Sequence, residues 1–356
     1  MPEAAKKVKC VVWDLDNTVW NGTLLEDEEV RLNQDAVSTI KELDRRGILN
    51  SVCSKNDGDF AMEKLRQFGI AEYFLYPQIG WDAKSESVRK IAQQINIGID
   101  TIAFIDDQPY ELDEVSFHCP EVRCFSADRI HGLLEQPEFT PDFITVDAQH
   151  RRQMYLSNIR RQKSEDSFSG PKEGFLKSLD MVFSIKEADY SDLKRVEELA
   201  ARTHQLNTTG YTYAFDELCA MMESPRYKLW VAGLDDKFGT YGKIGIALAE
   251  CMDDRWIIKL FLMSCRVMSR GVGSVFINYL INCAKEAGKS VYAEFLPTDR
   301  NRMMLITYRF MGFQEDHTTG DLMYLKYDFG TVHEYPAYIR LVLPDQNAAP
   351  LCEQQG

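Results

Sequence analysis

The stretch VKCVVWDLDNT, residues 8–18, joins an apolar run to two carboxylates, Asp14 and Asp16, that stand one residue apart. The apolar run predicts a buried strand, so both acids fall in the turn at its carboxyl end. Ligands of open α/β sheets bind at that end of the strands, and buried carboxylates are unfavourable unless positive charge accompanies them. The pattern therefore predicts a site for a divalent cation and a phosphate group. The alternative is an Asx turn that only caps the strand.

Three further stretches place complementary side chains at predicted strand ends or at a helix start. The run ILNSVC, residues 48–53, leads into a hydroxyl and a polar turn whose free backbone N–H groups can cradle a phosphate. A lysine opens a helical pattern at residue 84, where its ammonium can hold a phosphoryl oxygen. The run TIAFI, residues 101–105, ends in paired acids. The candidate side chains of these stretches are Ser54, Lys55, Asn56, Lys84, Asp106 and Asp107.

In this order the four stretches resemble the motifs of the haloacid dehalogenase-like phosphatase superfamily. The resemblance implies that Asp14 is the nucleophile that becomes an aspartyl phosphate. It also implies that Asp16 protonates the leaving oxygen and later deprotonates water. The implied cofactor is Mg²⁺, a hard cation with oxygen ligands, here from Asp14, the Asp16 backbone carbonyl, Asp106 and Asp107. Asp107 is the expected direct carboxylate ligand, and Asp106 either shares that task or pairs with Lys84.

Composition sets limits on the class of protein. With 356 residues, 45% of them hydrophobic, the chain is long enough for two domains with separate cores. No apolar stretch approaches a membrane span and the N-terminus lacks the apolar core of a signal peptide, so we expect a cytoplasmic protein that does not bind membranes. The nine cysteines form no C-x-x-C pair and are expected to be reduced thiols. A net charge of −14 argues against a general nucleic-acid binder.

The spacing of the motifs predicts how the chain is organised. Residues 1–135 form the phosphatase-like domain, and the gaps between its motifs are too short for a lid domain, which leaves the site open to a large partner. Residues 136–178 are a helical linker, and residues 331–356 are a C-terminal tail. The tail segment YPAYIRLVL, residues 335–343, is a predicted strand that can pack on either domain.

Residues 179–330 change in character and predict a second domain. Apolar runs predict strands at 181–187, 227–233, 243–252 and 256–263, and the loop RGVGS, residues 270–274, opens a predicted helix at 275–287. Glycines at a helix N-terminus suggest a pyrophosphate seat. The succession, which ends in YRFMGF at 308–313, resembles the GNAT acyltransferase fold. Because Val275 stands where that family usually has glycine or alanine, two roles stay open: binding of coenzyme A, or a structural or carrier-docking role.

The fusion of these two domains resembles the FkbH-like family over nearly the whole chain, to about residue 330. Supporting stretches are VCSKN at 52–56, FIDDQP at 104–109 and RTHQLNTT at 202–209. The expected fold class is therefore α/β: a Rossmann-like haloacid dehalogenase-type domain with a minimal cap, followed by an α+β GNAT-like domain. The resemblance implies a bifunctional glyceryl transferase and phosphatase. Such an enzyme dephosphorylates D-1,3-bisphosphoglycerate and loads the glyceryl group onto the phosphopantetheine of an acyl carrier protein for polyketide biosynthesis.

The chemistry of that reaction suggests two further residues. The acyl carbon of the substrate suits a thiolate, and Cys53 directly precedes Ser54, where Lys55, Lys84 and Mg²⁺ are expected to lower its pKa. Cys53 is thus the predicted carrier of the glyceryl thioester, with a buried core cysteine as the alternative. His204 follows a predicted helix at 191–202 and is the predicted base for the incoming carrier thiol, with a surface histidine at a helix end as the alternative.

A run of basic residues gives a candidate surface for the acyl carrier protein. Carrier proteins are acidic, and a basic patch in the linker would attract them. The residues of this expected patch are Arg151, Arg152, Arg160, Arg161 and Lys163. The alternative is a solvated helix face.

Two other functions remain open at this stage. One alternative is a phosphatase that acts on another phosphorylated metabolite or protein. The other is a phosphatase joined to an active N-acetyltransferase. A noncatalytic binding module is disfavoured, because all four acid and base positions of the phosphatase are present.

Overall fold

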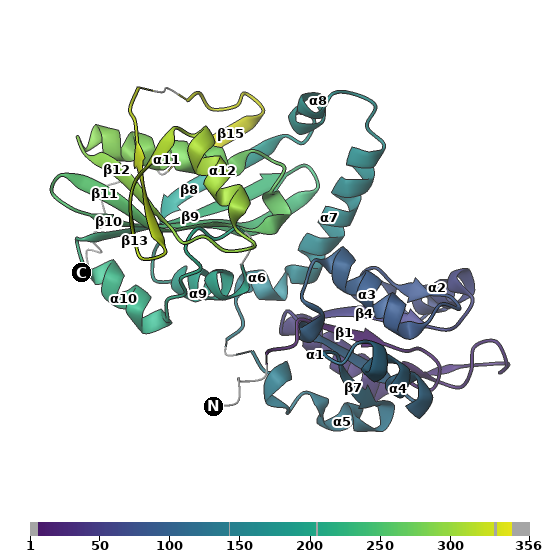
Figure 1. Ribbon diagram of the computed structural model, residues 1–356. Helices are drawn as coiled ribbons and strands as arrows, with labels where there is room; N and C mark the ends of the chain where they lie inside the picture. The colour runs from purple at the N-terminus through teal and green to yellow at the C-terminus, as the bar shows by residue number, and fades with distance from the viewer. Residues whose placement is uncertain (1–5, 142, 204–205, 331–332, 344–356) are drawn as a thin grey trace, which may run out of the picture. The chain divides into compact units, whose positions relative to one another are not determined.

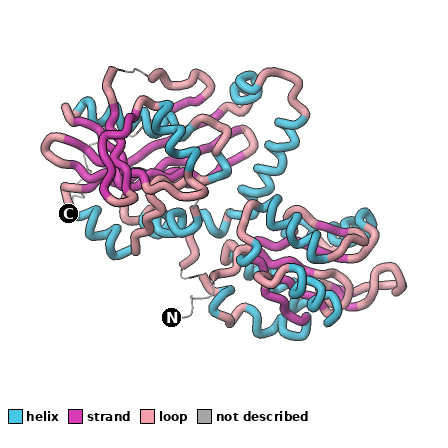
Figure 2. Tube along the Cα trace, viewed as in Figure 1, coloured by secondary structure: helices cyan, strands magenta, loops and turns pink. Residues whose placement is uncertain are grey.

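The computed structural model describes residues 6–141, 143–203, 206–330 and 333–343. The chain divides into two compact units, Met1–Leu156 and Ser157–Gly356, which are described separately. The division falls within helix α7 (Arg151–Asp166). Figure 2 shows strands and helices in both units.

The first unit is built on a parallel sheet of five strands in the order β5-β4-β1-β6-β7. The central strand β1 is in register with both neighbours, since Trp13 lies beside Val52 on one side and Ile105 on the other. The carboxyl ends of these strands therefore meet at one edge, which confirms the predicted parallel α/β sheet. The strands are β1 (Cys10–Trp13), β4 (Leu49–Ser54), β5 (Gln78–Ile79), β6 (Ile102–Asp106) and β7 (Arg123–Ser126).

Helices cover this sheet, as the continuous apolar runs of β1, β4 and β6 require, because parallel strands are buried on both faces. Apolar side chains of α1 and α2 share one core with Val11 and Trp13 of β1. Helices α3 and α4 pack against each other and against β4 and β6, respectively. The helices are α1 (Gln34–Arg45), α2 (Gly58–Gln67), α3 (Lys84–Ile95), α4 (Pro109–His118), α5 (Ile130–Leu133) and α6 (Val146–Gln149).

A short hairpin stands where a lid domain would be inserted between β1 and α1. It consists of β2 (Trp20–Asn21) and β3 (Arg31–Leu32), which pair antiparallel. The chain enters it through Asn17, whose φ of 52° lies in the left-handed region that asparagine tolerates better than most residues. The Asn17 side chain accepts a hydrogen bond from the backbone N–H of Gly22 and closes the turn.

The second unit contains a mixed sheet of eight strands in the order β13-β14-β12-β11-β10-β9-β8-β15. Neighbouring strands are antiparallel except at β11–β12 and β8–β15. The tail strand β15 therefore belongs to this unit. The strands are β8 (Met181–Glu187), β9 (Tyr227–Asp236), β10 (Gly239–Cys251), β11 (Arg255–Met263), β12 (Ser290–Phe295), β13 (Phe313–Thr319), β14 (Leu322–Tyr327) and β15 (Ile339–Val342).

Helices pack on both faces of this second sheet, and each face has its own core (Figure 1). Side chains of α11 and α12 form one core, and those of α9 and α10 form the other. The helices are α8 (Lys172–Lys177), α9 (Leu193–Arg202), α10 (Phe215–Glu223), α11 (Val272–Glu286) and α12 (Arg302–Phe310). In the described part of the chain, none of the helices combines the length and the apolar character that a membrane crossing requires.

The first arginines of α7 are buried in the first unit rather than displayed. Arg152 makes ion pairs with Asp44 at 3.0 Å and with Glu72 at 3.1 Å. The guanidinium of Arg151 donates to the backbone carbonyl of Gly47. Both side chains are therefore used for packing within the unit.

Arg161 is buried in the second unit in the same way. Its guanidinium forms a bidentate pair with Asp236, at 2.6 and 2.9 Å, and lies 3.7 Å from the centre of the Tyr241 ring. The expected five-residue docking patch is thus wrong for Arg151, Arg152 and Arg161, because these long basic side chains are buried against carboxylates and a backbone carbonyl that the sequence does not reveal. Arg160 is exposed.

We predict that Asp236→Ala lowers the free energy of unfolding by about 3–5 kcal/mol, because it leaves the buried Arg161 charge without its partner. Urea unfolding followed by tryptophan fluorescence measures the change. Arg160→Ala, at an exposed position of the same helix, is the control and should shift the value by no more than about 0.5 kcal/mol. Equal effects of the two variants would contradict the prediction.

Candidate active site

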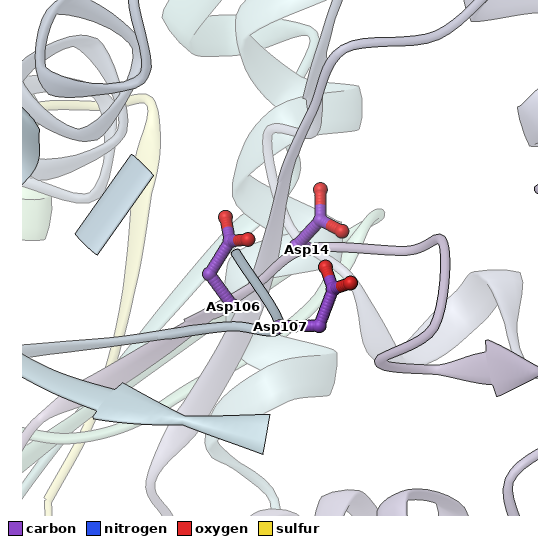
Figure 3. Close-up of side chains that lie close together, drawn as sticks. All are labelled: Asp14, Asp106 and Asp107. Carbon is purple, nitrogen blue, oxygen red and sulfur yellow. The ribbon is translucent and has the colours of Figure 1, made fainter. Parts of the chain in front are cut away.

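Three carboxylates gather at the edge where β1 and β6 end. Asp14 follows β1, Asp106 is the last residue of β6, and Asp107 follows it. One oxygen from each lies within 4.8 Å of the others, and Figure 3 shows the three side chains grouped at these strand ends. The grouping results from the parallel register of β1 and β6, which brings the two acidic turns side by side.

The Lys84 ammonium lies between two of these carboxylates. Its Nζ is 2.7 Å from Asp14 Oδ1 and 2.5 Å from Asp106 Oδ2, and all three side chains are nearly inaccessible to solvent. Lys84 is the first residue of α3, so the start of that helix fixes where the ammonium stands. One positive charge faces three carboxylates, which leaves the cluster in need of a further cation.

The remaining carboxylate has an oxygen free for that cation. Asp107 Oδ1 is buried and has no hydrogen-bond partner among the described residues. A hard divalent cation such as Mg²⁺ takes carboxylate oxygens as ligands. The residues present therefore fit Mg²⁺, with Asp14 and Asp107 as the carboxylates that would hold it and Asp106 engaged by Lys84.

Burial shapes the protonation of the cluster. It raises the pKa of Asp14 to about 7, against the opposing effect of Lys84. Burial also raises the pKa of Asp106, and it raises that of Asp107 with a further contribution from the charge of Asp106. Burial alone would lower the pKa of Lys84, but Asp14 and Asp106 raise it above its usual value. The lysine is therefore charged at neutral pH, and a bound cation would favour the ionised carboxylates.

Asp16 is held apart from these three carboxylates. Its Oδ1 accepts hydrogen bonds from Trp20 Nε1 at 2.7 Å and from the Leu24 backbone N–H at 3.0 Å. Its Oδ2 accepts one from Asn56 Nδ2 at 3.0 Å. Asn56, expected at the substrate, is thus a buried partner of Asp16 in this structure. The expected contribution of the Asp16 backbone carbonyl to the metal remains a prediction.

The end of β4 and the residue after it carry the other two expected phosphate contacts. Ser54 is the last residue of β4 and is buried, and its side chain acts to lower the pKa of Asp14. Lys55 makes an ion pair of 2.6 Å with Glu111 in the first turn of α4, a residue that the sequence reasoning missed. Because β1 lies between β4 and β6, this ion pair joins the segments on either side of Asp14. The only indication of Glu111 in the sequence is its position two residues after Pro109, the proline that opens α4.

Cys53 differs from its expected environment. It is almost fully buried near the end of β4, and its thiol donates to the Lys84 backbone carbonyl at 3.7 Å. Burial raises the pKa of Cys53 to about 12, although the Lys84 charge acts in the opposite direction. Burial therefore opposes the expected lowering of this pKa, because desolvation outweighs the one nearby ammonium. Its role as acyl carrier stays a prediction.

His204, the candidate base in the second unit, lies outside the described residues. A cavity of about 100 Å³ opens at the N-terminus of α11, where Gly271 caps the helix with a φ of 78°. Four methionines, Gly273 and Ser274 are among its lining residues, and none of those residues carries a positive charge. Val275 is buried in the core instead. Binding of coenzyme A and a structural or carrier-docking role both remain predictions for this unit.

The comparisons with known proteins add few constraints. No protein-family model matches the chain, and no curated protein gives a significant match. Among solved structures, the chain is similar to the N-terminal part of protein BF1531 from Bacteroides fragilis, described as containing a phosphatase domain complexed with Mg. The identity is 30% over 34% of this chain and 36% of that one, with a TM-score of 0.32, so the chain spans about a third of that structure's length.

The chain is also similar to solved structures of another kind. One is the ribosomal-protein-S18-alanine N-acetyltransferase from Escherichia coli, with 15% identity over 43% of this chain and 99% of that one and a TM-score of 0.33. Another is the PaiA N-acetyltransferase from Thermoplasma acidophilum, with 12% identity over 41% and 99% and a TM-score of 0.32.

We predict that Asp107→Asn weakens Mg²⁺ binding at least about tenfold. Mutation of a residue that only hydrogen-bonds a metal ligand already lowers metal affinity by about that factor, and Asp107 is an expected direct ligand. Isothermal titration of the full chain with Mg²⁺ alone measures the affinity. Asp113→Asn makes the same charge change at an exposed position of α4 and should bind Mg²⁺ as the unsubstituted chain does. Unchanged affinity in Asp107→Asn would remove this carboxylate from the metal site.

Proposed function

We propose that the first unit catalyses Mg²⁺-dependent phosphoryl transfer through Asp14. The observation that carries the proposal is the Lys84 ammonium between Asp14 and Asp106, beside the buried free oxygen of Asp107. An anion-binding lysine and an unsatisfied carboxylate oxygen at one strand edge are what a phosphate ester with a metal ion requires. Bound Mg²⁺ supplies charge neutralisation for the phosphoryl oxygens.

The chain's own residues divide the reaction into two steps. An Asp14 carboxylate oxygen forms a bond to phosphorus while the bond to the ester oxygen breaks, and Asp16 gives that oxygen its proton. Asp16 then takes a proton from water, whose oxygen attacks the aspartyl phosphate and releases inorganic phosphate. Lys84 orients Asp14 through the hydrogen bond of 2.7 Å that joins its ammonium to Asp14 Oδ1.

The finer proposal is glyceryl transfer to an acyl carrier protein. Cys53 supports it by its position, since its thiol lies against the backbone of Lys84, in the wall of the phosphoryl site. The Cys53 sulfur bonds to the acyl carbon of D-1,3-bisphosphoglycerate while the bond from that carbon to the phosphate oxygen breaks, which gives a thioester. The inorganic phosphate that leaves takes the thiol proton. The phosphopantetheine thiol of the carrier, with His204 as its base, then takes the acyl group and returns the Cys53 thiolate. The burial of Cys53 requires the end of β4 to open before the attack.

That same burial favours a second candidate function. A phosphatase that acts on another phosphorylated metabolite or protein needs no exposed thiol. Its site would be accessible because, within described residues 17–33, a hairpin stands in place of a lid domain. The two functions share Asp14 and differ in their need for Cys53.

We predict that Asp14→Asn lowers phosphate release from p-nitrophenyl phosphate in Mg²⁺ about a thousandfold or more, since it removes the nucleophile. Acid-quenched intact-protein mass spectrometry should show a phosphoryl adduct on the unsubstituted chain and none on the variant. Asp113→Asn, exposed on α4, serves as the control and should keep both the rate and the adduct. A phosphoryl adduct on Asp14→Asn would exclude Asp14 as the nucleophile.

We predict that Cys53→Ala abolishes glyceryl loading while phosphate release from simple monoesters continues. Intact-protein mass spectrometry after incubation with D-1,3-bisphosphoglycerate and Mg²⁺, with and without a phosphopantetheinylated carrier, detects the adduct and its transfer. Cys124→Ala, at a partly buried cysteine on β7, is the matched control and should load normally. Full loading by Cys53→Ala would contradict the role of Cys53 as thioester carrier. Phosphate release without any adduct on the unsubstituted chain would favour the second candidate function, a phosphatase that does not transfer acyl groups.

A further inference from the structure

The Asp16 carboxyl group is held by three donors, two from the hairpin that follows it and one from the loop after β4. Oδ1 receives the Trp20 indole N–H and the Leu24 backbone N–H, and Oδ2 receives the Asn56 amide. A carboxylate oxygen has two lone pairs, so the two donors on Oδ1 fill its capacity. Oδ2 keeps one lone pair. Proton transfer by Asp16 is therefore confined to Oδ2.

Trp20 is the rigid member of this set. Its side chain is fully buried in the core of the first unit, with the Phe68 ring centre 6.2 Å away. The indole has a single polar hydrogen, which a buried tryptophan must direct at an acceptor, and here the acceptor is Asp16. Trp20 is also joined to Asp16 by a backbone bridge across the tight turn at Asn17. Packing in the core thus fixes the orientation of an otherwise rotatable carboxyl group.

A fixed orientation of the Asp16 carboxyl group matters for the rate if Asp16 is the acid and base of the reaction. A general acid must lie within hydrogen-bond reach of the leaving oxygen, and loss of orientation reduces the rate even when the group itself is present. We propose that Trp20 and Asn56 are positioning residues that lock the Asp16 carboxyl group so that Oδ2 alone transfers the proton. The proposal rests on the proposed phosphoryl-transfer function and adds residues to which that function gave no catalytic role.

The proposal also reassigns Asn56. The sequence pattern placed this amide at the substrate phosphate, whereas the structure places it on Asp16. A substrate-binding amide affects KM, while a positioning amide affects kcat with KM nearly unchanged. The two assignments therefore differ in a measurable quantity.

The test uses Trp20→Phe, which removes the N–H and keeps an aromatic ring in the core. Trp13→Phe is the matched control, because Trp13 is equally buried in the same core and its N–H donates to Asn50 at 2.9 Å. Each variant is assayed as the full chain with Mg²⁺ on an alkyl phosphate, whose leaving oxygen needs a proton, and on p-nitrophenyl phosphate, whose leaving oxygen does not.

We expect Trp20→Phe to lower kcat for the alkyl phosphate about 10- to 100-fold at nearly constant KM, part of the 10²- to 10⁴-fold that a general acid contributes. With p-nitrophenyl phosphate, the first step should stay fast and the second should slow, which appears as a burst of nitrophenol. Trp13→Phe should show neither the leaving-group dependence nor the burst. Asn56→Ala repeats the test from a loop position and should also lower kcat rather than raise KM.

The outcomes separate this inference from the proposed function. If Trp20→Phe and Trp13→Phe behave alike, and Asn56→Ala raises KM, the positioning role is overturned while phosphoryl transfer stands. If Asp16→Asn itself keeps full activity on the alkyl phosphate, the assignment of Asp16 as the acid fails, and the positioning role fails with it. A loss of folding in Trp20→Phe, visible by circular dichroism, shifts the decision to the KM and kcat of Asn56→Ala.

Discussion

One ammonium group organises the candidate site. Lys84 contacts Asp14 and Asp106, which end two adjacent parallel strands, and so ties β1, β6 and the start of α3 together. Without that positive charge, carboxylates at this depth would repel each other and be driven to their neutral forms. With it, the cluster still has an excess of negative charge. The proposed metal ion would balance the negative charge that the shared lysine leaves over.

The second unit uses the same physics for packing. Arg161 and Asp236 form a buried pair, and Arg270 pairs with Glu165 at 3.0 Å while lying over the Phe175 ring. Like Lys84, these arginines pair with acids that are distant in the sequence. Among the described residues, however, neither arginine lies in a cluster of three acids like that of Asp14, Asp106 and Asp107. A buried ion pair is thus a poor indicator of function by itself. The difference at Lys84 is the surplus of acids at the ends of parallel strands.

Much of the first unit could be predicted because its signals are local. The apolar runs of β1, β4 and β6 mark strands buried on both faces, and each polar turn follows its strand directly. What the sequence did not reveal are partners brought together by the fold. Glu111 reaches Lys55 from the other side of β1, and the packing of α3 against β4 covers Cys53. The basic run of α7 likewise gave no sign that Arg161 meets a carboxylate 75 residues further along the chain.

The ion pair between Lys55 and Glu111 keeps a positive charge beside the strand ends. The carboxylate of Glu111 is nearly buried, whereas Lys55 is about a third exposed, so the lysine is the partner free to move. The other carboxylate oxygen of Glu111 is buried without a partner among the described residues, so displacing Lys55 would leave the whole carboxylate unpaired. Glu111 therefore acts as a restoring partner that draws Lys55 back to this position after any displacement.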